Sequence, residues 1–555
     1  MTTKPTLAIY GIKDRNALLY SAFVHDHNLC LMQDGKVQQY LQLERYTRYK
    51  YDNRLDLFLE ELIDNKLLDL PKEFDIVSVN NFVGNAFISK NGRIRFESSK
   101  NWKLSNKLEP AMAYYQDSDW TGKELNAFNC SHELAHIASC LPFYGNFMDN
   151  SLLVSFDGGS SLGNYSAFHY INGKLHLLEN NWEQLGYLSK FYNDNALTFQ
   201  LLHAKPGDHC SVPGKLMGYA CWGSYDLKIE QWLQNHEYFK NYWNQTDVIL
   251  QSIRREFGIE VTSYDTKHPF LQNIAATYQH IFERDFLNKI THLKELTNAD
   301  FLYYAGGCAL NILTNTRIIE NSLFNKIFIP PCCNDSGLSI GAASFLESQK
   351  GNTIEIHSPY LCNVGLEKSQ TNPVSKELIK AVADILLKGG IIGVCNGNAE
   401  IGPRALGNRS LLALANNKEL SRKLSMDVKK REWYRPVAPI MLKEVAKMVT
   451  QQTVHQLSKY MLMDFTIKEE YCKSLEGVVH VNQTARIQVI EKEDNLFMYQ
   501  LLKYLYDNYQ VLALINTSFN VQGEPIVHTP QNAVDSAKKM KLDALIIDNQ
   551  LFTNL

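Results

Sequence analysis

The sequence predicts an α/β protein in which two duplicated halves are followed by a further α/β domain, and three observations support that class. Short apolar runs of strand length alternate with helical periodicities along the 555 residues. Two stretches open alike, each with an apolar strand ahead of an Asp-Gly turn. A polar segment without periodicity, residues 351–372, separates the last part of the chain. We therefore expect a first domain at residues 1–350, a linker at 351–372 and a second domain at 373–555.

The first half opens with a strand from Thr6 and a hairpin. Asp34-Gly35 lies between two apolar runs, and Asp-Gly in that position is a strong turn signal. A strand from Ser151 likewise leads into Asp157-Gly158, and this recurrence indicates the duplication. Apolar spacing assigns the other elements: a helix at 55–68, strands at 74–79 and 301–305, a mostly helical stretch at 227–296 and, in the last part, strands at 391–395 and 511–515.

Composition and charge narrow the class of partner. Lys and Arg number 56 and Asp and Glu 59, so the formal net charge of -3 supports neither a nucleic acid nor a membrane surface as partner. No apolar run approaches the roughly 20 residues that span a bilayer, and the first residues lack the apolar core of a secretory signal. The 11 cysteines are scattered without a C-x-x-C pair, which argues against a disulfide framework. We expect a cytoplasmic protein.

The segment His132-Glu133-Leu134-Ala135-His136 matches the H-E-x-x-H pattern of zinc proteases. Residues four apart lie on one face of a helix, so the two histidines can direct their imidazoles at one cation while Glu133 lies on another face. The alternative is a pair of polar residues that face water. The surrounding run is mostly apolar, and this favours burial and metal ligation.

Three more segments stand next to predicted strands. Asp335, in Asn334-Asp335-Ser336-Gly337, is either a helix cap or a hard oxygen donor that completes a His2Asp site suited to iron or another divalent metal. Asp157-Gly158-Gly159 and Gly306-Gly307 offer backbone N–H groups to phosphate oxygens, although glycine at such a turn is often only a backbone convenience. The common glycine-rich nucleotide motifs are missing, so a nucleotide would be held in another way.

The last part of the chain concentrates arginines in loop-like sequence. Lys429-Lys430-Arg431 alone would be read as a solvated face. The arginines at 404, 409, 435 and 486, however, lie near Gly, Pro or Thr and not on a periodic helical surface. Planar guanidinium groups bind phosphate and carboxyl phosphate groups bidentately. The pattern therefore predicts a pocket for a polyanionic substrate.

A set of motifs along nearly the whole chain resembles those of a known family. In order, they are His25-Asp26 ahead of Asp34-Gly-Lys, Glu44-Arg45-Tyr-Thr-Arg48, His132-x-x-x-His136, Ala305-Gly-Gly-x-Ala-Leu-Asn311, Asp335-Ser-Gly, Glu400-Ile-Gly-Pro-Arg-Ala-Leu-Gly-Asn-Arg-Ser410, Arg431-Glu-x-x-Arg-Pro-x-Ala-Pro439 and Asn516-Thr-Ser-Phe-Asn-x-x-Gly-Glu-Pro525. With these motifs the sequence resembles the O-carbamoyltransferases that act on antibiotics such as tobramycin, novobiocin and cephamycins and on nodulation factors.

The resemblance implies a fold and a set of site residues. The first domain looks like the tRNA threonylcarbamoyl-transfer enzymes, with an actin/sugar-kinase-like (ASKHA) fold of two halves, and the second is similar to a YrdC-like α/β domain. His25 and Asp26 would be catalytic, with His25 the general base. The other implied roles are metal binding, with iron favoured, for His132, His136 and Asp335; nucleotide binding for Gly306, Gly307, Asn311, Lys430, Ser518 and Asn520, with a phosphate or metal contact for Asp157; and carbamoyl phosphate binding for Arg404, Arg435, His480 and Arg486.

The resemblance also implies a reaction in two steps. Carbamate from carbamoyl phosphate attacks ATP, accompanied by Mg2+, to give carbamoyl adenylate and pyrophosphate. Because the adenylate hydrolyses readily, it would travel through a closed route to the first domain. There a hydroxyl of a small molecule or glycan takes the carbamoyl group, and AMP leaves. The resemblance further suggests a homodimer.

Three other functions compete with this interpretation. A zinc protease would need Glu133 as its base. A tRNA threonylcarbamoyl enzyme would use threonylcarbamoyl adenylate and a basic surface, which the near-zero net charge and the fused second domain argue against. A sugar-kinase-like scaffold without activity would have no use for four loop arginines.

Overall fold

Eight strands form the first sheet of the computed structural model. The model describes residues 4–13, 24–81, 84–98, 106–116, 122–159, 161, 163–181, 201–203, 209–237, 246–261, 264–367 and 372–554. The sheet order is β3-β2-β1-β4-β8-β7-β6-β5. The strands are β1 (Thr6–Tyr10), β2 (Asn28–Gln33), β3 (Lys36–Gln42), β4 (Asp75–Val79), β5 (Ala86–Ile88), β6 (Ile94–Ser98), β7 (Glu109–Gln116) and β8 (Gly122–Cys130).

The second sheet repeats the central pattern of the first. Its order is β11-β10-β9-β12-β13, with β9 (Ser151–Phe156), β10 (Tyr165–Ile171), β11 (Lys174–Asn181), β12 (Phe301–Ala305) and β13 (Lys326–Phe328). Each sheet has a three-stranded antiparallel meander followed by two strands parallel to its first strand, β4 and β8 in one case and β12 and β13 in the other. This confirms the predicted duplication, and the repeated arrangement is that of an ASKHA-type protein.

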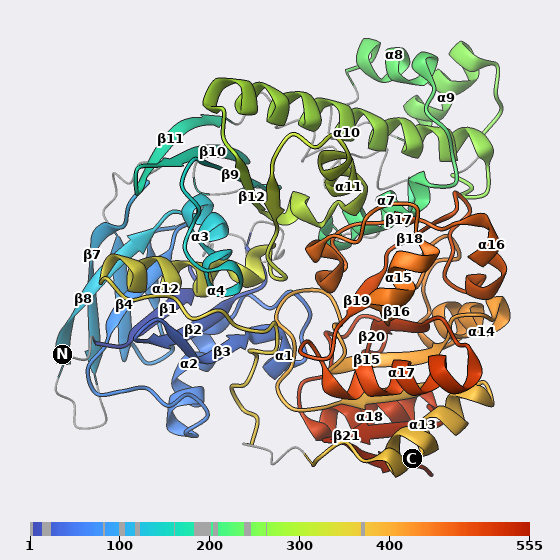
Figure 1. Ribbon diagram of the computed structural model, residues 1–555. Helices are drawn as coiled ribbons and strands as arrows, with labels where there is room; N and C mark the ends of the chain where they lie inside the picture. Colours follow the sequence, from blue (N-terminus) through green and yellow to red (C-terminus); the bar gives the residue numbers. More distant parts are fainter. Residues whose placement is uncertain are drawn as a thin grey trace.

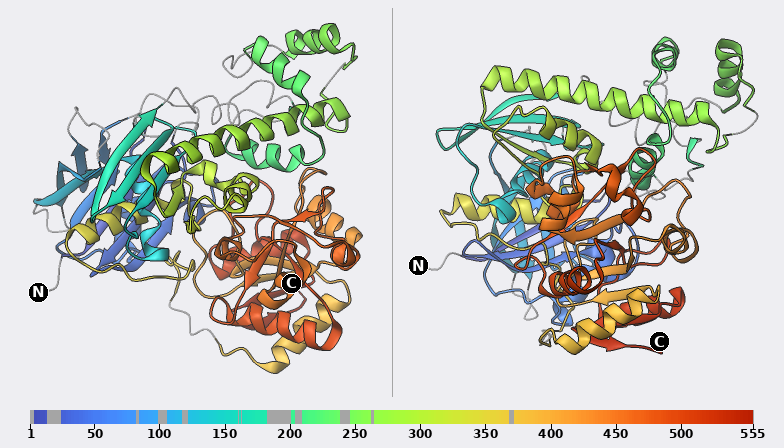
Figure 2. Two further views of the ribbon diagram at one scale, coloured as in Figure 1. Left: turned by 45° about the horizontal axis from the view of Figure 1, so that its top comes forward. Right: turned by 45° about the vertical axis from the view of Figure 1, so that its right-hand side comes forward.

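Helices fill the space between the two sheets and cover their outer faces (Figure 1). Between the sheets, α12 (Leu338–Gln349) packs on β1, β2 and β4, and α3 (His132–Ala138) packs on α12, β9 and β12. The long helix α10 (Pro269–Thr297) runs along the far side of the second sheet (Figure 2). The shorter helices of this domain are α1 (Leu43–Thr47), α2 (Leu55–Asp64), α4 (Leu141–Tyr144), α7 (Val212–Ala220), α8 (Leu227–Asn235), α9 (Thr246–Phe257) and α11 (Ile312–Glu320).

The alternation of side chains along β1 separates two cores. Leu7 and Ile9 point to the core shared with α2, whereas Ala8 and Tyr10 point to the core that contains α3 and α12. Successive residues of a strand face opposite sides of the sheet, so a strand that is buried on both faces reads as a continuous apolar run. The same alternation carries Tyr10, at the carboxyl end of β1, toward the space between the two sheets.

The last part of the chain forms a separate mixed sheet, drawn in orange and red in Figure 1. Its order is β19-β16-β20-β15-β14-β21-β22. The strands are β14 (Ile392–Cys395), β15 (Arg409–Leu414), β16 (Ala438–Leu442), β19 (Gln488–Ile490), β20 (Leu514–Ser518), β21 (Ala544–Ile547) and β22 (Gln550–Phe552), and a small pair comprises β17 (Phe465–Thr466) and β18 (Thr484–Ala485). The α-helices are α13 (Lys376–Leu387), α14 (Lys418–Arg422), α15 (Lys443–Val449), α16 (Glu469–Cys472), α17 (Leu496–Tyr509) and α18 (Pro530–Met540). The predicted C-terminal α/β domain is confirmed.

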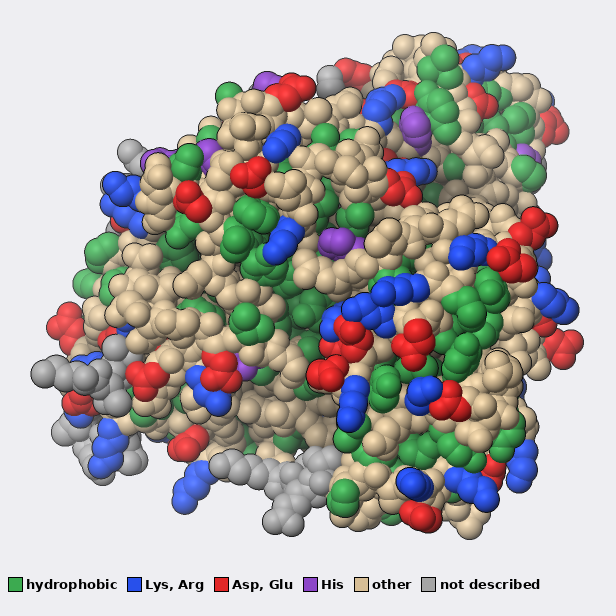
Figure 3. Space-filling model, viewed as in Figure 1, with side chains coloured by type: hydrophobic (Ala, Val, Ile, Leu, Met, Phe, Trp, Pro, Cys, Tyr) green, Lys and Arg blue, Asp and Glu red, His purple; other side chains and the backbone are tan. Residues whose placement is uncertain are grey.

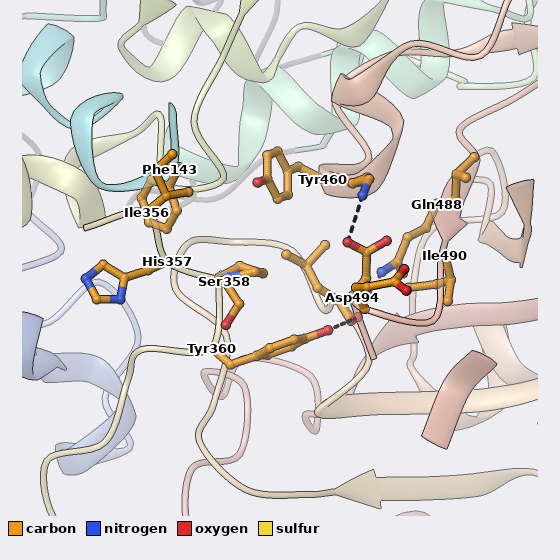
Figure 4. A pocket seen from close by; sticks show the side chains of 14 residues that line it. Phe143, Ile356, His357, Ser358, Tyr360, Tyr460, Gln488, Ile490 and Asp494 are labelled. Atoms are coloured by element: carbon orange, nitrogen blue, oxygen red, sulfur yellow. Dashed lines mark hydrogen bonds and ion pairs between the residues drawn. The ribbon is translucent and has the colours of Figure 1, made fainter. Parts of the chain in front are cut away.

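The segment between α12 and α13 connects the two domains. Its described residues, 350–367 and 372–375, form no helix and pair only at Cys362, which bridges Tyr40 of β3 to Ala399. A cavity of about 160 Å³ lies where this segment meets both domains. Phe143, Ile356, Tyr360, Tyr460 and Asp494 are among the side chains around it (Figure 4). None of the predicted site residues lines this cavity.

Two sequence expectations need adjustment. The helix expected at 55–68 ends at Asp64, where Asn65 serves as the C-cap. The strand expected at 511–515 is observed as Leu514–Ser518. Because Leu514 through Ser518 pair with β15 and Ala438–Ile440 pair with Leu514–Asn516, hydrogen bonding to neighbouring strands and not hydropathy sets the start of this strand. Among the described residues, no helix is both long and apolar enough to cross a bilayer.

Candidate functional site

Helix α3 presents the two histidines at the end of β8. Ser131 is the N-cap, with its Oγ accepting from Leu134 N at 3.2 Å, and His132 N donates to Ser161 Oγ at 2.9 Å. The rings of His132 and His136, one turn apart, have centroids separated by 4.7 Å, and both are buried. Glu133 is buried near Cys130, where burial and then the Glu133 charge raise the pKa of the thiol.

Asp335 reaches these histidines because α12 crosses α3 at very short range. A Cβ atom at Gly341 of α12 would lie 2.0 Å from the carbonyl oxygen of Ala135, so only glycine permits this crossing. Asp335 stands in the 3-10 turn that precedes α12. Its Oδ1 lies 3.4 Å from His132 Nε2 and 3.5 Å from His136 Nε2. Residues 199 positions apart thus meet at one point.

Asp157 is the fourth member of this group. It follows β9, and its Oδ2 lies 2.9 Å from His136 Nε2 while also accepting from Gly307 N at 2.9 Å. One ligand atom from each of His132, His136, Asp157 and Asp335 lies within 4.8 Å of the others. The sequence indicated a phosphate or metal contact for Asp157, and the structure brings it to the metal candidates.

These four side chains, the metal cluster, fit a divalent metal ion. Two ligands that are each about 2.1 Å from one ion lie about 3.0–3.4 Å apart in octahedral or tetrahedral geometry, close to the separations found here. The Nε2 atoms of both histidines face the carboxylates of Asp157 and Asp335 at 2.9–3.5 Å, and the Nδ1 atoms of both are buried without a hydrogen-bond partner in the described part of the chain. Buried imidazoles without such partners are costly, and two nitrogens with two carboxylates suit iron or a similar divalent metal.

The electrostatics of the metal cluster favour the charged form of Asp335. Burial raises the pKa of Asp335, but the charges of His132 and His25 and hydrogen bonds from the histidines outweigh it, and the pKa lies well below its usual value. Burial lowers the pKa of His136, but Asp157 and Asp335 raise it to about 9. A cation in this position would take over the role of the imidazolium protons.

The predicted catalytic pair lies beside the metal cluster. His25 Nδ1 is 3.1 Å from Asp26 Oδ2 and 3.9 Å from Asp335 Oδ2. Asp26 has a φ of 55°, a left-handed conformation that Asp tolerates better than most residues. Burial opposes protonation of His25, whereas Cys210, Asp335 and Asp26 raise its pKa well above its usual value.

Two supporting residues were not found from the sequence. Tyr10 OH donates to Asp335 Oδ2 at 2.9 Å. Asn28 Nδ2 donates to the carbonyl oxygens of Asp26 at 2.6 Å and Asp335 at 2.9 Å, and Asn28 Oδ1 accepts from Ser339 N at 2.9 Å. These bonds fix the positions of the segments that carry the catalytic pair and Asp335. Their only sequence signal is their place at the ends of β1 and β2.

The glycines after β12 form a sharp turn beside Asp157. Gly306 has a φ of 99°, and a Cβ atom there would lie 2.1 Å from the carbonyl oxygen of Phe156. Glycine is therefore required for β12 to end against β9. Asn311 caps α11 by accepting from Thr314 N at 3.2 Å, and its side chain also exchanges hydrogen bonds with Gln279. The observed contacts of Asn311 are structural, and its nucleotide role stays a prediction.

A cation pocket gathers arginines in the second domain. Arg404, Arg431, Arg435 and Arg486 lie near enough to one another for their charges to interact: burial first and then neighbouring arginines lower the pKa of Arg486 well below its usual value, and burial lowers that of Arg404 to about 10. Arg404 Nε and Arg486 Nε are buried without a hydrogen-bond partner among the described residues. The carboxylate of Glu432 lies 3.3 Å from Arg435 and is shared with Lys215. Buried guanidinium groups gathered in this way suit an anion, and the binding of carbamoyl phosphate by Arg404, Arg435 and Arg486 stays a prediction.

The adjacent lysines differ in burial, and the nucleotide role of Lys430 stays a prediction. Lys429, not the predicted Lys430, is buried, and its Nζ donates to Ser518 O at 2.6 Å, Asn520 O at 2.7 Å and Asn520 Oδ1 at 2.6 Å. Lys430 is exposed, with a φ of 51°. Burial, followed by the charges of Arg431 and Arg435, holds the pKa of Lys429 well below its usual value. Sequence did not distinguish these neighbours, because the run has no helical or strand period that would assign a face.

Arg409 and His480 make contacts of another kind, and the carbamoyl phosphate role of His480 stays a prediction. Arg409 is buried and donates to the backbone carbonyl oxygens of Asn396, Gly397, Asn408 and His528 at 2.8–3.0 Å. Because its guanidinium group is already bonded to backbone carbonyl oxygens, the expectation that Arg409 binds an anion is wrong. His480 lies next to Trp222, with ring centroids 5.6 Å apart, and its pKa is lowered mainly by burial.

The metal cluster and the cation pocket are neighbours. Cys333, two residues before Asp335, is close enough for its charge to affect Arg404. A Cβ atom at Gly402 would lie 2.3 Å from the carbonyl oxygen of Pro331. The loop that carries Arg404 therefore packs against the segment that carries Asp335. Outside, Figure 3 shows charged side chains of both signs interspersed over one face of the molecule.

The strand topology defines an ASKHA-type domain followed by an α/β domain that carries a buried arginine cluster. The model of the carbamoyltransferase N-terminus matches residues 101–344, and that of the carbamoyltransferase C-terminus matches residues 383–554. The chain belongs to the carbamoyltransferase family of enzymes.

Curated relatives match over most of the chain. An uncharacterised protein of Methanocaldococcus jannaschii is 26% identical over 96% of this chain and 98% of its own length. Nodulation protein NolNO of Sinorhizobium fredii is 27% identical over 97% of this chain and 80% of its own length. Nodulation protein U of Azorhizobium caulinodans is 27% identical over 72% and 74%.

Solved structures show weaker similarity. HypF of T. kodakarensis is 13% identical and covers 63% of this chain and 48% of its own, with a TM-score of 0.33. A hexokinase of Schistosoma mansoni is 11% identical over 62% and 86%, with a TM-score of 0.28. The assignment of the fold rests on the repeated strand topology and not on these scores.

Proposed function

We propose that this carbamoyltransferase makes carbamoyl adenylate from carbamoyl phosphate and ATP in its second domain and transfers the carbamoyl group to a hydroxyl of a small molecule or glycan in its first. The observation that carries the proposal is the contact between the Arg404 loop and the Pro331–Cys333 segment, which joins the cation pocket to the metal cluster. A labile anhydride made in one site can reach the other without crossing bulk water.

The first step uses the cation pocket. Arg404, Arg435 and Arg486 bind the phosphoryl groups, and Lys429 and Arg431 extend the same positive surface toward Ser518. Water bonds to the carbamoyl carbon, the C–O bond between that carbon and the phosphate breaks, and inorganic phosphate and carbamate are released. A carbamate oxygen then attacks the α-phosphorus of ATP, and pyrophosphate leaves. Fixed cations stabilise the charge that builds on the equatorial oxygens and on the leaving group.

The second step uses His25. In its neutral form, which its raised pKa makes the minor form at neutral pH, His25 donates its Nδ1–H to Asp26, and Nε2 takes the proton of the acceptor hydroxyl. The alcohol oxygen bonds to the carbamoyl carbon, the carbon–oxygen bond to the adenylate breaks, and AMP leaves. His132, His136, Asp157 and Asp335 would hold a divalent metal, with iron(II) our prediction. When bound, this ion supplies Lewis-acid neutralisation of charge on the AMP phosphate.

The first domain would hold the adenylate. The N–H of Gly307 is directed at the Asp157 carboxylate, whereas the N–H of Gly306 donates to Cys333 O at 2.7 Å and holds the turn against the segment that leads to Asp335. This arrangement keeps the phosphate next to the metal cluster and next to His25. The acceptor hydroxyl would belong to a small molecule or glycan, as the resemblance to carbamoyltransferases that act on antibiotics and nodulation factors implies.

The experiment is an acceptor screen with isotopically labelled carbamoyl phosphate. The protein, ATP and Mg2+ are incubated with a metabolite extract, and acceptors are detected by a mass gain of one carbamoyl group that carries the label. We expect labelled product only when ATP is present. Label transfer that proceeds equally without ATP would contradict the adenylate route. The matched control is His25→Gln, which should abolish labelling of the acceptor while pyrophosphate is still released.

A further inference from the structure

The motif Glu44-Arg45-Tyr-Thr-Arg48 has no role in the reaction as described so far. It forms helix α1, directly after β3, and Arg48 is its C-cap with a φ of 60° and its N–H donating to Glu44 O at 3.0 Å. Arg45 is fully buried and Arg48 is largely buried. Both guanidinium groups belong to the first domain, and both make their hydrogen bonds to the second.

Arg45 holds the loop that carries Arg404. Its NH2 donates to the carbonyl oxygen of Gly402 at 2.9 Å, and its Nε lies 3.5 Å from Glu44 Oε1. Gly402 is two residues before Arg404 and is already packed on Pro331. The backbone that places Arg404 is therefore clamped between Arg45 and the metal-cluster segment.

Arg48 holds the loop beyond Ser518 and Asn520. Its NH1 donates to Ile526 O at 2.6 Å, its NH2 donates to Pro525 O at 2.7 Å, and Glu524 Oε2 lies 3.6 Å away. Asn520 Nδ2 donates to Glu524 O at 2.9 Å, and Asn520 Oδ1 accepts from Lys429 at 2.6 Å. The position of Lys429 is thus tied to Arg48 through one loop.

We propose that Arg45 and Arg48 are positioning residues for the cation pocket: the first domain shapes the polyanion site of the second through two buried guanidinium groups. This inference deepens the proposed function and rests on it. Glu44 Oε2 also accepts from Tyr51 N at 3.0 Å, and the Tyr51 ring lies 6.1 Å from that of His25. The same helix therefore borders both sites, so that the pocket reaches its binding geometry only when the acceptor domain is docked.

If these arginines only stabilise the contact between the two domains, a different result is expected for anion binding. Hydrogen bonds from a charged group to backbone carbonyls would then add stability without affecting anion affinity. The two roles separate when anion binding and thermal stability are measured on the same variant. Arg48 is the better target because Arg45 is fully buried and its replacement could impair folding.

The test compares Arg48→Gln and Arg48→Lys with the full-length wild type, and Arg95→Gln is the matched control. Arg95 is exposed in the first domain, and its side chain bonds only to its own turn at Gly92 O in the described structure. Binding of inorganic pyrophosphate is measured by calorimetry, which requires no turnover, and pyrophosphate release from ATP is measured with carbamoyl phosphate as the varied substrate.

We expect Arg48→Gln to weaken pyrophosphate binding and to lower kcat/KM for carbamoyl phosphate by roughly ten- to a hundredfold, the range of a charged hydrogen bond. Arg48→Lys should recover part of the loss, and Arg95→Gln should match the wild type. Unchanged pyrophosphate affinity in Arg48→Gln, with or without a lower melting temperature, would overturn the inference. If pyrophosphate affinity depends on Arg48 but the wild type releases no pyrophosphate from ATP, only the proposed function is contradicted.

Discussion

His136 Nε2 lies 2.9 Å from Asp157 Oδ2, which joins the second half of the duplicated fold to the helix that carries both histidines. The contact exists because β9 ends directly before Asp157 and because Gly306 and Gly307 leave room for its carboxylate beside β12. A His2Asp2 donor set follows, with both histidines on the helix after β8 of the first sheet and both carboxylates in segments that follow strands of the second sheet.

The donor set predicts metal loss in specific variants. Asp157→Asn and His136→Ala should each lower the bound divalent metal, counted by plasma mass spectrometry, to a small fraction of that in the wild type, since loss of one ligand typically costs orders of magnitude in affinity. Glu133→Gln should keep both metal and carbamoyl transfer. The opposite pattern, a metal-replete but inactive Glu133→Gln protein, would instead support the zinc protease.

The lysine pair in the second domain offers a matched comparison. Lys429→Met should reduce pyrophosphate release at least a hundredfold, because the buried ammonium group that orients Ser518 and Asn520 is lost. Lys430→Met should leave the rate within about twofold, since this side chain is exposed. Equal losses in the rate of pyrophosphate release would show that the burial of Lys429 does not matter for the first step. The rates are measured without acceptor, so that only the first step is reported.

Substitution of Arg409 should lower stability, whereas substitution of Arg404 should weaken substrate binding. Arg409→Lys removes most of the bonds to four backbone carbonyl oxygens and should lower the free energy of unfolding by about 2–4 kcal/mol. Arg404→Lys should leave the melting temperature nearly unchanged and raise KM for carbamoyl phosphate at least tenfold, because an ammonium group cannot bind a phosphoryl group bidentately. Chemical denaturation and initial-rate kinetics on both proteins check this. A stable Arg409→Lys protein with weak substrate binding would reverse the assignment.

Sequence reasoning succeeded where a pattern has a fixed spatial meaning. The i, i+4 spacing of His132 and His136 predicted that both lie on one helical face. The two strands that each lead into an Asp-Gly turn predicted the duplicated topology. It could not tell Lys429 from Lys430, because the run lies in an irregular segment and no period assigns a face. It also took Arg409 for an anion ligand, since the carbonyl oxygens that occupy it come from segments up to 119 residues away. Such long-range partners are invisible to local composition.

The contact between the two domains predicts a dependence of stability on pH. Asp464 accepts from Thr316 Oγ1 at 2.6 Å, and burial raises its pKa from 3.8 to about 6, with Glu283 adding to the rise and Arg317 opposing it. Between pH 3.8 and about pH 6 the folded protein binds more protons at Asp464 than the unfolded chain does. The free energy of unfolding therefore falls as the pH rises through this range, and the destabilisation by the buried carboxylate is fully present above about pH 6.

Asp464→Asn should remove this cost. We expect the variant to exceed the wild type in free energy of unfolding by about 1–3 kcal/mol at neutral pH, and the difference should vanish near pH 4. Urea denaturation at a series of pH values measures both curves. A variant that is less stable than the wild type at neutral pH would mean that the carboxylate is stabilised by its neighbours.

The most direct test of the central claim identifies the nucleotide products. Full-length protein, ATP, Mg2+ and carbamoyl phosphate are mixed with an acceptor found in the screen, and the products are separated by ion-exchange chromatography. The account predicts AMP and pyrophosphate in equal amounts, each matched by one carbamoylated acceptor. Formation of ADP and phosphate, with neither AMP nor pyrophosphate, would contradict carbamoyl adenylate formation in the cation pocket.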